Sequence, residues 1–380
     1  MLSAACPETF HVCVPRKQPD EMNDKTCDSP VVKSQHKVPR KYLAAWCNAD
    51  GELFTLRKGG KVFSCGVEGV EAENYFYQFK KLSIEELGDV FRCATTAVDG
   101  IMSVENVQVF LQDTAGSAFI NNILSGKCSD RTEFESYMER ACQIGAFSAE
   151  FSARAWNVWS RKNAGLELES NEVDRYVKNG GEMLMCKIEN DAWPALNLAV
   201  DGLVEKINEN GALKWHLAKY MVCQTMRGDK FVELFNKIFR RLLSGGGTGC
   251  IASYLRYFSA ERVLRSLRQK MSEVSFRLIE NTTEEEFLTG DNPVFRPASS
   301  QGGEFHLNEW AFCFPVSPRR ALLLMENGAE SKYARFLKPS SNEVVELNRF
   351  LCDSCVSQIH ATHSAILEKD VYKQRFVCNK

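Results

Sequence analysis

The chain has 380 residues, of which 44% are hydrophobic and 25% charged, a composition usual for a soluble globular protein. A chain of this length can bury a large core in one or two domains. The formal net charge of -2 excludes a global field directed at nucleic acid or a membrane. The chain contains no apolar run of about 18 residues, so the sequence predicts no transmembrane helix.

The cysteines and the amino terminus indicate a cytoplasmic protein. The segment Met1–Cys6 is only briefly apolar and lacks the basic residues of a secretory signal. The 15 cysteines are odd in number and scattered over helical and loop segments, so we expect reduced thiols. Residues 1–34 have mixed polarity and no period, which predicts a disordered tail before a single domain over residues 35–380.

The first stretch with clear local signals begins at His36. Pro39 fixes its own φ and favours an extended residue before it, and Arg40 follows directly. Leu43 and Trp46 lie three residues apart, a spacing that suits one face of a helical turn. His36 either hydrogen-bonds local backbone beside this turn or contributes a titratable group to a site.

The remaining patterns predict a fold of the α+β class. Two short strands, 52–56 and 62–65, flank a Gly-Gly turn and form a hairpin. Helical periodicity dominates from residue 83 to about residue 281 and returns over residues 343–369. Between these helical regions, short apolar or alternating runs predict antiparallel strands of a small sheet packed with the hairpin, at 286–289, 304–307, 311–316 and 321–325.

A zinc-like spacing occurs near the carboxyl end, with Cys352, Cys355, His360 and His363. If this segment is one helix, its first and last candidate ligands are about 16 Å apart along the axis. A single zinc ion needs all its ligands within about 2.3 Å. We therefore predict no metal site here, and the sequence identifies no cofactor.

Two features of residues 237–270 could bind phosphate groups. The Gly-rich loop 244–249 precedes a helix, but it lacks the Lys-Ser/Thr pair of a P-loop. Arg262, Arg265 and Arg268 recur every three residues, so they share a broad helical face. This face is a candidate nucleic-acid surface, or a solvated face paired with acids elsewhere.

A second polar stretch, Thr289–Pro293, follows a predicted strand. Gly290 frees the backbone there, and Pro293 stops the strand and restricts Asn292. Asp291 is then held at a strand end, where a carboxylate can face a cleft. It can equally form an Asx-type turn that satisfies backbone donors.

Together these stretches resemble the motifs of the family catalogued as domain of unknown function 4238. The segment 36–46 is similar to its opening His-x-Val-Pro-x-x-Tyr-Leu motif, which ends in an aromatic residue, and 289–294 is similar to its Thr-Ser-Asp-Asn-Pro-Val motif. Gln224 and Arg227 match a Gln…Arg pair in the middle of the family. Gly290 replaces the family's Ser, and Trp46 replaces its usual Phe. The resemblance spans about residues 35–360 and implies an intracellular protein without assigning a reaction.

We expect an intracellular enzyme, a hydrolase or nuclease acting on a phosphoester or nucleic acid, or alternatively a non-catalytic binding module. In the enzyme, His36 acts as general acid or base, and Asp291 orients it or binds a metal ion. The residues expected to bind substrate are Arg40, Tyr42, Gln224, Arg227 and Asn292. In the module, the same residues form a buried network that locks the two ends of the chain together.

Overall fold

The structure is a computed structural model that describes residues 33–74, 76–78, 170–231, 233, 263–264, 266–297 and 311–378. The predicted tail therefore lies outside the described residues, except for its last two positions. The Gly-rich loop, Arg262, Arg265 and the expected strand 304–307 also lie outside them.

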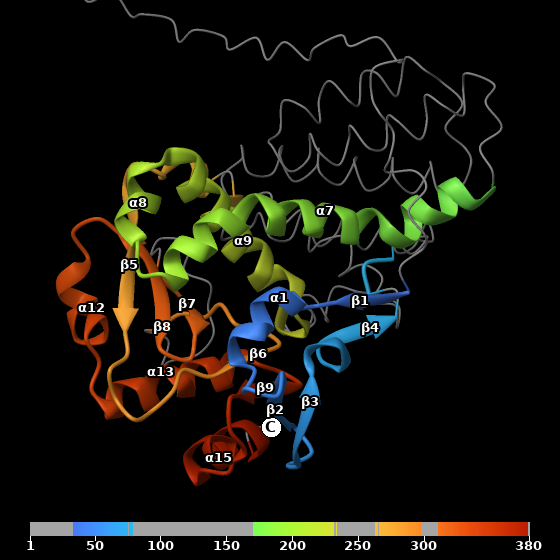
Figure 1. Cartoon of the computed structure of the whole chain (residues 1–380). Helices are drawn as coiled ribbons and strands as arrows, with labels where there is room; N and C mark the ends of the chain where they lie inside the picture. The colour runs from blue at the N-terminus through green and yellow to red at the C-terminus, as the bar shows by residue number, and fades with distance from the viewer. Residues whose placement is uncertain are drawn as a thin grey trace, which may run out of the picture. The chain divides into compact units, whose positions relative to one another are not determined.

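The described strands form three antiparallel sheets (Figure 1). They are β1 (Ser34–His36), β2 (Glu52–Arg57), β3 (Val62–Gly66), β4 (Ala72–Asn74), β5 (Val274–Glu280), β6 (Thr289–Gly290), β7 (Ala311–Ser317), β8 (Arg320–Glu326) and β9 (Gln358–Ala361). The strand orders are β1-β4, β3-β2-β9-β6 and β5-β8-β7.

The described helices lie before, between and after these strands. They are α1 (Arg40–Leu43), α7 (Ser170–Val200), α8 (Val204–Glu209), α9 (Gly211–Arg227), α12 (Glu330–Leu337), α13 (Ser341–Ser354), α14 (Ser364–Leu367) and α15 (Asp370–Cys378), with the 3-10 turns η2 (Ala44–Trp46) and η3 (Val67–Gly69). Helices and antiparallel sheets together define an α+β protein, which confirms the predicted class.

Local sequence explains where several helices begin and end. Asn210 caps α9, and its side chain accepts from the amides of Ala212 and Leu213. Ser340 and Glu343 form a capping box at the start of α13. α7 continues through Pro194 and ends at Val200.

The four-stranded sheet joins the two ends of the chain. The predicted hairpin β2–β3 is confirmed, and β2 also pairs with β9, so that Phe54 lies opposite Ala361. On its other edge β9 pairs with β6, where Thr289 lies opposite His360. The motif at residues 289–294 is therefore anchored to the amino-terminal hairpin through a single short strand, β9.

The sheet β5-β8-β7 is buried on both faces, because alternate side chains of each strand enter two different cores. Leu322 and Leu324 of β8 pack in the first core cluster, with α7, α8 and α9. Leu323 and Met325 pack in the second core cluster, with α12, α13 and α15. Burial on both faces explains why β8 reads as a continuous apolar run rather than as an alternating one.

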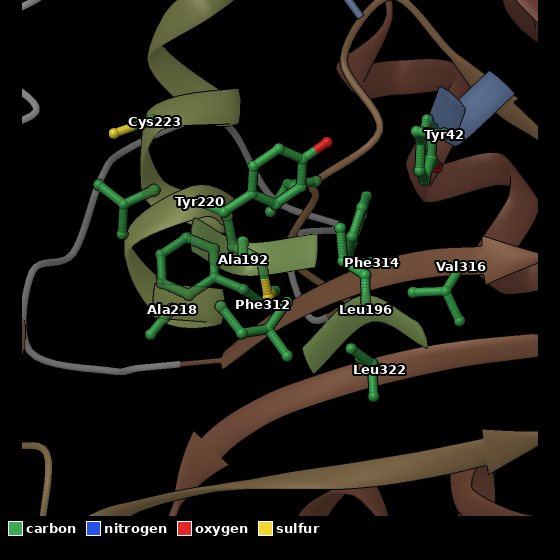
Figure 2. Close-up of a cluster of buried hydrophobic side chains, with 14 of the residues drawn as sticks. Tyr42, Ala192, Leu196, Ala218, Tyr220, Cys223, Phe312, Phe314, Val316 and Leu322 are labelled. Carbon is green, nitrogen blue, oxygen red and sulfur yellow. The ribbon is translucent and has the colours of Figure 1, made fainter. Parts of the chain in front are cut away.

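Aromatic side chains connect the amino-terminal motif to the first core cluster. Figure 2 shows Tyr42 and Phe314 lying close together, and their rings stack at a centroid distance of 5.1 Å. Tyr220 of α9 reaches the other side of Phe314 at 5.8 Å. Trp46 is fully buried, and its indole N–H donates to the carbonyl of Phe287 at 2.9 Å. These contacts fasten residues 42–46 to the centre of the molecule.

Three sequence-based expectations about strands and helices were wrong. Residues 274–280 were assigned to the helical region but form β5, which pairs along its whole length with β8. The segment 343–369 was expected to be one helix, but α13 ends at Ser354 and β9 and α14 follow. Of the run 286–289 only the last residue is in a strand, β6. In each case pairing with a distant strand decided the conformation.

Gly290 is required by the close approach of two segments. A Cβ atom at this position would lie 2.6 Å from the Cys355 Sγ and 2.6 Å from the Gln358 carbonyl oxygen. A serine, which the family pattern has here, does not fit this packing unless β9 shifts. The departure from the pattern therefore coincides with tight packing between β6 and β9.

In the part of the chain that the structure describes, no helix combines the length and the apolar character needed to cross a bilayer.

We predict that Gly290→Ala destabilises the protein by about 1–3 kcal/mol, because the new methyl group must displace backbone atoms of β9. Urea denaturation would measure the change. Gly66→Ala in β3 is the matched control, since a Cβ atom there meets nothing within 4 Å. Equal stabilities of the two variants would contradict the packing argument.

Candidate functional site

His36 is the last residue of β1 and lies opposite Ala72 of β4. Its carbonyl oxygen accepts from the Arg227 Nη2 at 2.8 Å and from the Tyr77 hydroxyl at 3.0 Å. The imidazole is half-buried, and its Nε2 atom is buried without a hydrogen-bond partner among the described residues. Burial lowers the pKa of His36 below its ordinary value of 6.5, and the nearby Arg40 and Arg227 charges lower it further.

Arg40 and Glu182 lie within electrostatic range of each other. Arg40 opens α1, and its side chain is 56% exposed, with Glu68 as a loose ion-pair partner at 3.8 Å. Glu182 projects from α7, and its Oε2 atom is also buried with no hydrogen-bond partner in the part of the chain that the structure describes. Burial raises the pKa of Glu182 to about 7, although the Arg40 charge opposes the shift. His36 and Glu182 thus both lie within electrostatic range of Arg40. We refer to these three residues as the His36 cluster.

Arg227 is a buried hub, only 2% exposed, at the end of α9. Its guanidinium pairs with Glu189 and donates to the Tyr77 hydroxyl and to the His36 carbonyl. Gln224, one turn earlier, accepts from Arg227 at 3.4 Å and donates to the Lys37 carbonyl at 3.0 Å. These two residues therefore hold the backbone of residues 36–37 against α7 and α9.

Tyr42 lies in the core, 4% exposed, and its hydroxyl group is satisfied by protein atoms. The hydroxyl contacts the Thr289 Oγ1 at 2.8 Å and donates to the Pro315 carbonyl at 2.8 Å. Tyr42 thus connects the amino-terminal motif to β6 and β7. The structure gives this side chain a bridging position rather than one beside the His36 cluster.

Asp291 closes the turn between α13 and β9. It is 1% exposed, and its carboxylate accepts from the amides of Val356 and Ser357 and from the Ser357 hydroxyl, at 2.6–3.2 Å. Asn292 donates to the carbonyl of Ser354 at 3.2 Å. Among the described hydrogen bonds, none joins Asp291 to His36. The structure thus brings His36, Arg40 and Arg227 together, whereas the Asp291 carboxylate is bound by the turn at residues 356–357 and the Asp291 carbonyl lies next to Gly228.

A buried acid–imidazole pair was not identified from the sequence. Glu71 is 3% exposed and has a left-handed φ of 54°, which is uncommon for a residue other than glycine. Its Oε1 atom lies 3.0 Å from Nε2 of the fully buried His360, whose Nδ1 lies 2.9 Å from the Thr55 Oγ1. Burial raises the pKa of Glu71 well above its ordinary value and lowers the pKa of His360 to about 4. Burial therefore disfavours the charged form of each group.

No feature of the sequence indicated that Glu71 and His360 form a buried pair. His360 was considered only as a ligand in the zinc-like spacing, and nothing in the local sequence distinguished Glu71. A turn does split the segment that was read as one helix. Even so, among the described residues no group of three or more His, Cys, Asp or Glu side chains is arranged to hold a metal ion.

The basic face is described only in part. Arg262 and Arg265 lie outside the described residues. The guanidinium of Arg268 lies over the ring of Trp215, 5.6 Å from its centroid. This cation–π contact accounts for Arg268 without a nucleic-acid partner.

The fold and the site define an α+β protein whose chain ends share one sheet and a buried polar network. The chain belongs to the family described as "Protein of unknown function (DUF4238)", which it matches over residues 34–365. The family expected from the sequence is thereby confirmed. Neither the curated proteins nor the solved structures contain a match to the chain.

We predict that Arg227→Lys destabilises the protein by about 2–4 kcal/mol. A lysine cannot reproduce the forked contacts to Tyr77, Glu189 and the His36 carbonyl, and those buried groups then lose their partner. Arg335→Lys is the control, because Arg335 forms a half-exposed pair with Glu346 and should change stability by less than about 1 kcal/mol. Guanidinium denaturation would compare the two variants, and similar losses would contradict the buried-hub assignment.

The raised pKa of Glu182 also predicts a pH-dependent stability. The folded state keeps this proton up to about pH 7, whereas the unfolded chain releases it near the ordinary value of 4.5. Folding therefore takes up a proton between these values, and the stability from this group falls as the pH rises from 4.5 to 7. Glu182→Gln should remove this fall, which we expect to be about 1–3 kcal/mol after allowing for partial exposure.

Stability curves of the native protein and of Glu182→Gln at pH 5 and pH 7.5 would measure this difference. Comparing the two proteins cancels the contribution of His36, whose lowered pKa acts in the opposite direction. Glu205→Gln, the same change at an exposed position of α8, serves as the control. Identical pH dependence in all three proteins would show that Glu182 is ionised in the folded state.

Proposed function

We propose that this protein is an intracellular hydrolase that acts on a phosphoester, with the His36 cluster as its catalytic centre. The observation that carries the proposal is the pair of buried, unpartnered atoms, His36 Nε2 and Glu182 Oε2, both near the exposed Arg40 guanidinium. Buried polar atoms normally have a partner, so two orphans beside an exposed cation indicate a binding position for a polar substrate.

The shifted pKa values assign opposite roles to the two titratable groups. His36 has a lowered pKa, so it is neutral at pH 7 and accepts a proton from the attacking water. Glu182 has a pKa of about 7, so it holds a proton that it donates to the leaving alkoxide oxygen. Water then adds to phosphorus as the ester P–O bond breaks. Arg40 stabilises the charge on the non-bridging oxygens.

In this proposal the carboxylate role moves from Asp291 to Glu182. The Asp291 oxygens already accept hydrogen bonds from Val356 and Ser357, whereas one Glu182 oxygen accepts none in the described part of the chain. Arg227 acts as a positioning residue, because its guanidinium holds the His36 carbonyl. The free thiols of the described cysteines are in keeping with a cytoplasmic location.

A second candidate function is a non-catalytic binding module, and a specific observation favours it. Tyr42, Gln224, Arg227, Asp291 and Asn292 are each at most 6% exposed, and all five hydrogen-bond to protein atoms. This is the closed network expected if the shared motifs serve stability alone. In that case the His36 cluster performs no chemistry.

Hydrolysis of bis(p-nitrophenyl) phosphate and of labelled single-stranded RNA and DNA would test the proposal. We expect His36→Gln and Glu182→Gln to lower kcat about 10²–10⁴-fold, as for the loss of a general acid or base. Arg40→Ala should raise KM more than it lowers kcat. The pH profile should be bell-shaped, with one limb below 6.5 and the other near 7.

His363→Gln is the matched control, since His363 is exposed and lies apart from the His36 cluster in the sequence. It should retain full activity and stability. Activity that survives in both His36→Gln and Glu182→Gln would refute the catalytic assignment. If a folded native protein hydrolyses none of these substrates, the binding module becomes the better assignment.

A further inference from the structure

Gln35 is a buried amide next to His36 that the proposed reaction does not use. It is fully buried, although it belongs to a strand of only three residues, β1. Its side-chain nitrogen donates to the carbonyl of Lys178 in α7 at 2.7 Å, and its side-chain oxygen accepts from the backbone amide of Tyr77 at 2.7 Å. One side chain thus joins three segments that are distant in the sequence.

The contact with α7 falls on the helical turn that carries Glu182. Because Glu182 follows Lys178 by four positions, its amide donates to the Lys178 carbonyl in an α-helix, and the two side chains lie on one face. Gln35 donates to this same carbonyl. It therefore holds the turn that ends at Glu182 against the strand in which His36 is the next residue.

The contact with Tyr77 supports the other titratable member of the His36 cluster. The Tyr77 hydroxyl donates to the His36 carbonyl at 3.0 Å and accepts from the buried Arg227 guanidinium. Gln35 thus holds the backbone of the residue whose hydroxyl group holds His36. Its two hydrogen bonds bear on both residues that transfer protons in the proposed reaction.

An amide is the side chain that this position requires. It supplies one donor for a carbonyl and one acceptor for an N–H group, whereas a carboxylate lacks the donor and an apolar side chain lacks both. Both partners of Gln35 are backbone atoms, so the bonds locate α7 and residue 77 themselves rather than side chains that rotate. Because the amide is buried, losing a partner costs more than it would at the surface.

We propose that Gln35 is a positioning residue, which sets the placement of the Glu182 carboxyl group relative to the backbone that carries His36. In the proposed reaction it touches neither the substrate nor the reacting atoms, and it acts through α7 and Tyr77. Its effect on catalysis rests on the proposed hydrolase function. Its effect on the surroundings of Glu182 does not, so the two effects are measured separately.

The first measurement follows the titration of Glu182 by NMR in protein with isotope-labelled glutamate side chains, and Glu182→Gln identifies its resonance. In the native protein the pKa of this carboxyl group should be about 7. Gln35→Met keeps the length of the side chain and removes both hydrogen bonds. The released turn then admits water, so the pKa of Glu182 should fall to about 6 or below, toward its ordinary value of 4.5.

Asn208→Leu is the matched control, because Asn208 also donates to one backbone carbonyl and accepts from one backbone amide, both of Phe276 in β5, at 2.9 Å. It should leave the titration of Glu182 unchanged. The proposal is overturned if Glu182 titrates in Gln35→Met as it does in the native protein, or if Asn208→Leu shifts the titration equally. If Gln35→Met does not fold, Gln35→Asn repeats the measurement, since its amide is one methylene too short to reach both partners.

The second measurement compares kinetics on a phosphoester that the native protein hydrolyses. Gln35→Met should lower kcat about 10–100-fold, as for a displacement of about 1 Å between reacting groups. KM should stay close to the native value, because Arg40 is unchanged. An unchanged kcat in Gln35→Met would overturn the positioning role. If the native protein hydrolyses no phosphoester, the proposed function fails, and the titration of Glu182 still decides whether Gln35 positions it.

Discussion

The pairing of β9 with β2 and β6 is the interaction on which the rest of the structure depends. It joins residues 358–361 to residues 54–57, which lie roughly 300 positions earlier, and to residues 289–290, which lie roughly 70 positions earlier. Closing loops of this length costs conformational entropy, so the strand must be held by more than its own few hydrogen bonds. The buried side chains of Ile359 and Ala361 and the contacts of His360 supply that stabilisation.

The buried polar side chains of the described residues fall into two groups with different physical roles. Arg227, Gln224, Tyr42 and Asp291 have partners within the protein, and each connects segments that are distant in sequence. Buried charges and amides are costly unless they are paired, so such residues specify one arrangement of the elements. Orphaned atoms such as those on His36 and Glu182 are the exceptions, and an exception to this rule is where a ligand is best sought.

The backbone segments that carry His36 and Glu71 are linked through the short sheet β1-β4. His36 lies opposite Ala72, and the Lys37 amide donates to the Glu71 carbonyl at 2.7 Å. Arg227 holds the His36 carbonyl from one side, and β9 holds Glu71 from the other. A change in the charge of His36 or of Glu71 therefore acts on the same backbone, residues 36–37 and 71–72. This connection gives the motif at residues 36–46 a structural purpose alongside any chemistry.

Local sequence was sufficient to predict the helices and strands whose sequence patterns lie within a few consecutive residues. The Gly-Gly turn predicted the hairpin, the helical period predicted α9, and the apolar runs predicted β7 and β8. The strand β5 was misassigned, although its apolar residues alternate over part of its length, because helical periodicity continued up to it. β9 was misassigned because its short segment is extended only when β2 and β6 are beside it.

The candidate site likewise divides into features that the sequence predicted and features that only the tertiary structure decided. Sequence alone determined the fold class, the family and the residue types from which a site could be built, including His36, Arg40 and Arg227. Only the tertiary structure decided that Glu182 lies within electrostatic range of Arg40, that the Asp291 carboxylate is bound by the turn at residues 356–357, and that Glu71 and His360 form a buried pair. The reason is physical: burial and the approach of charges from distant segments set the pKa and the partners of a side chain, and neither is encoded in its local neighbours.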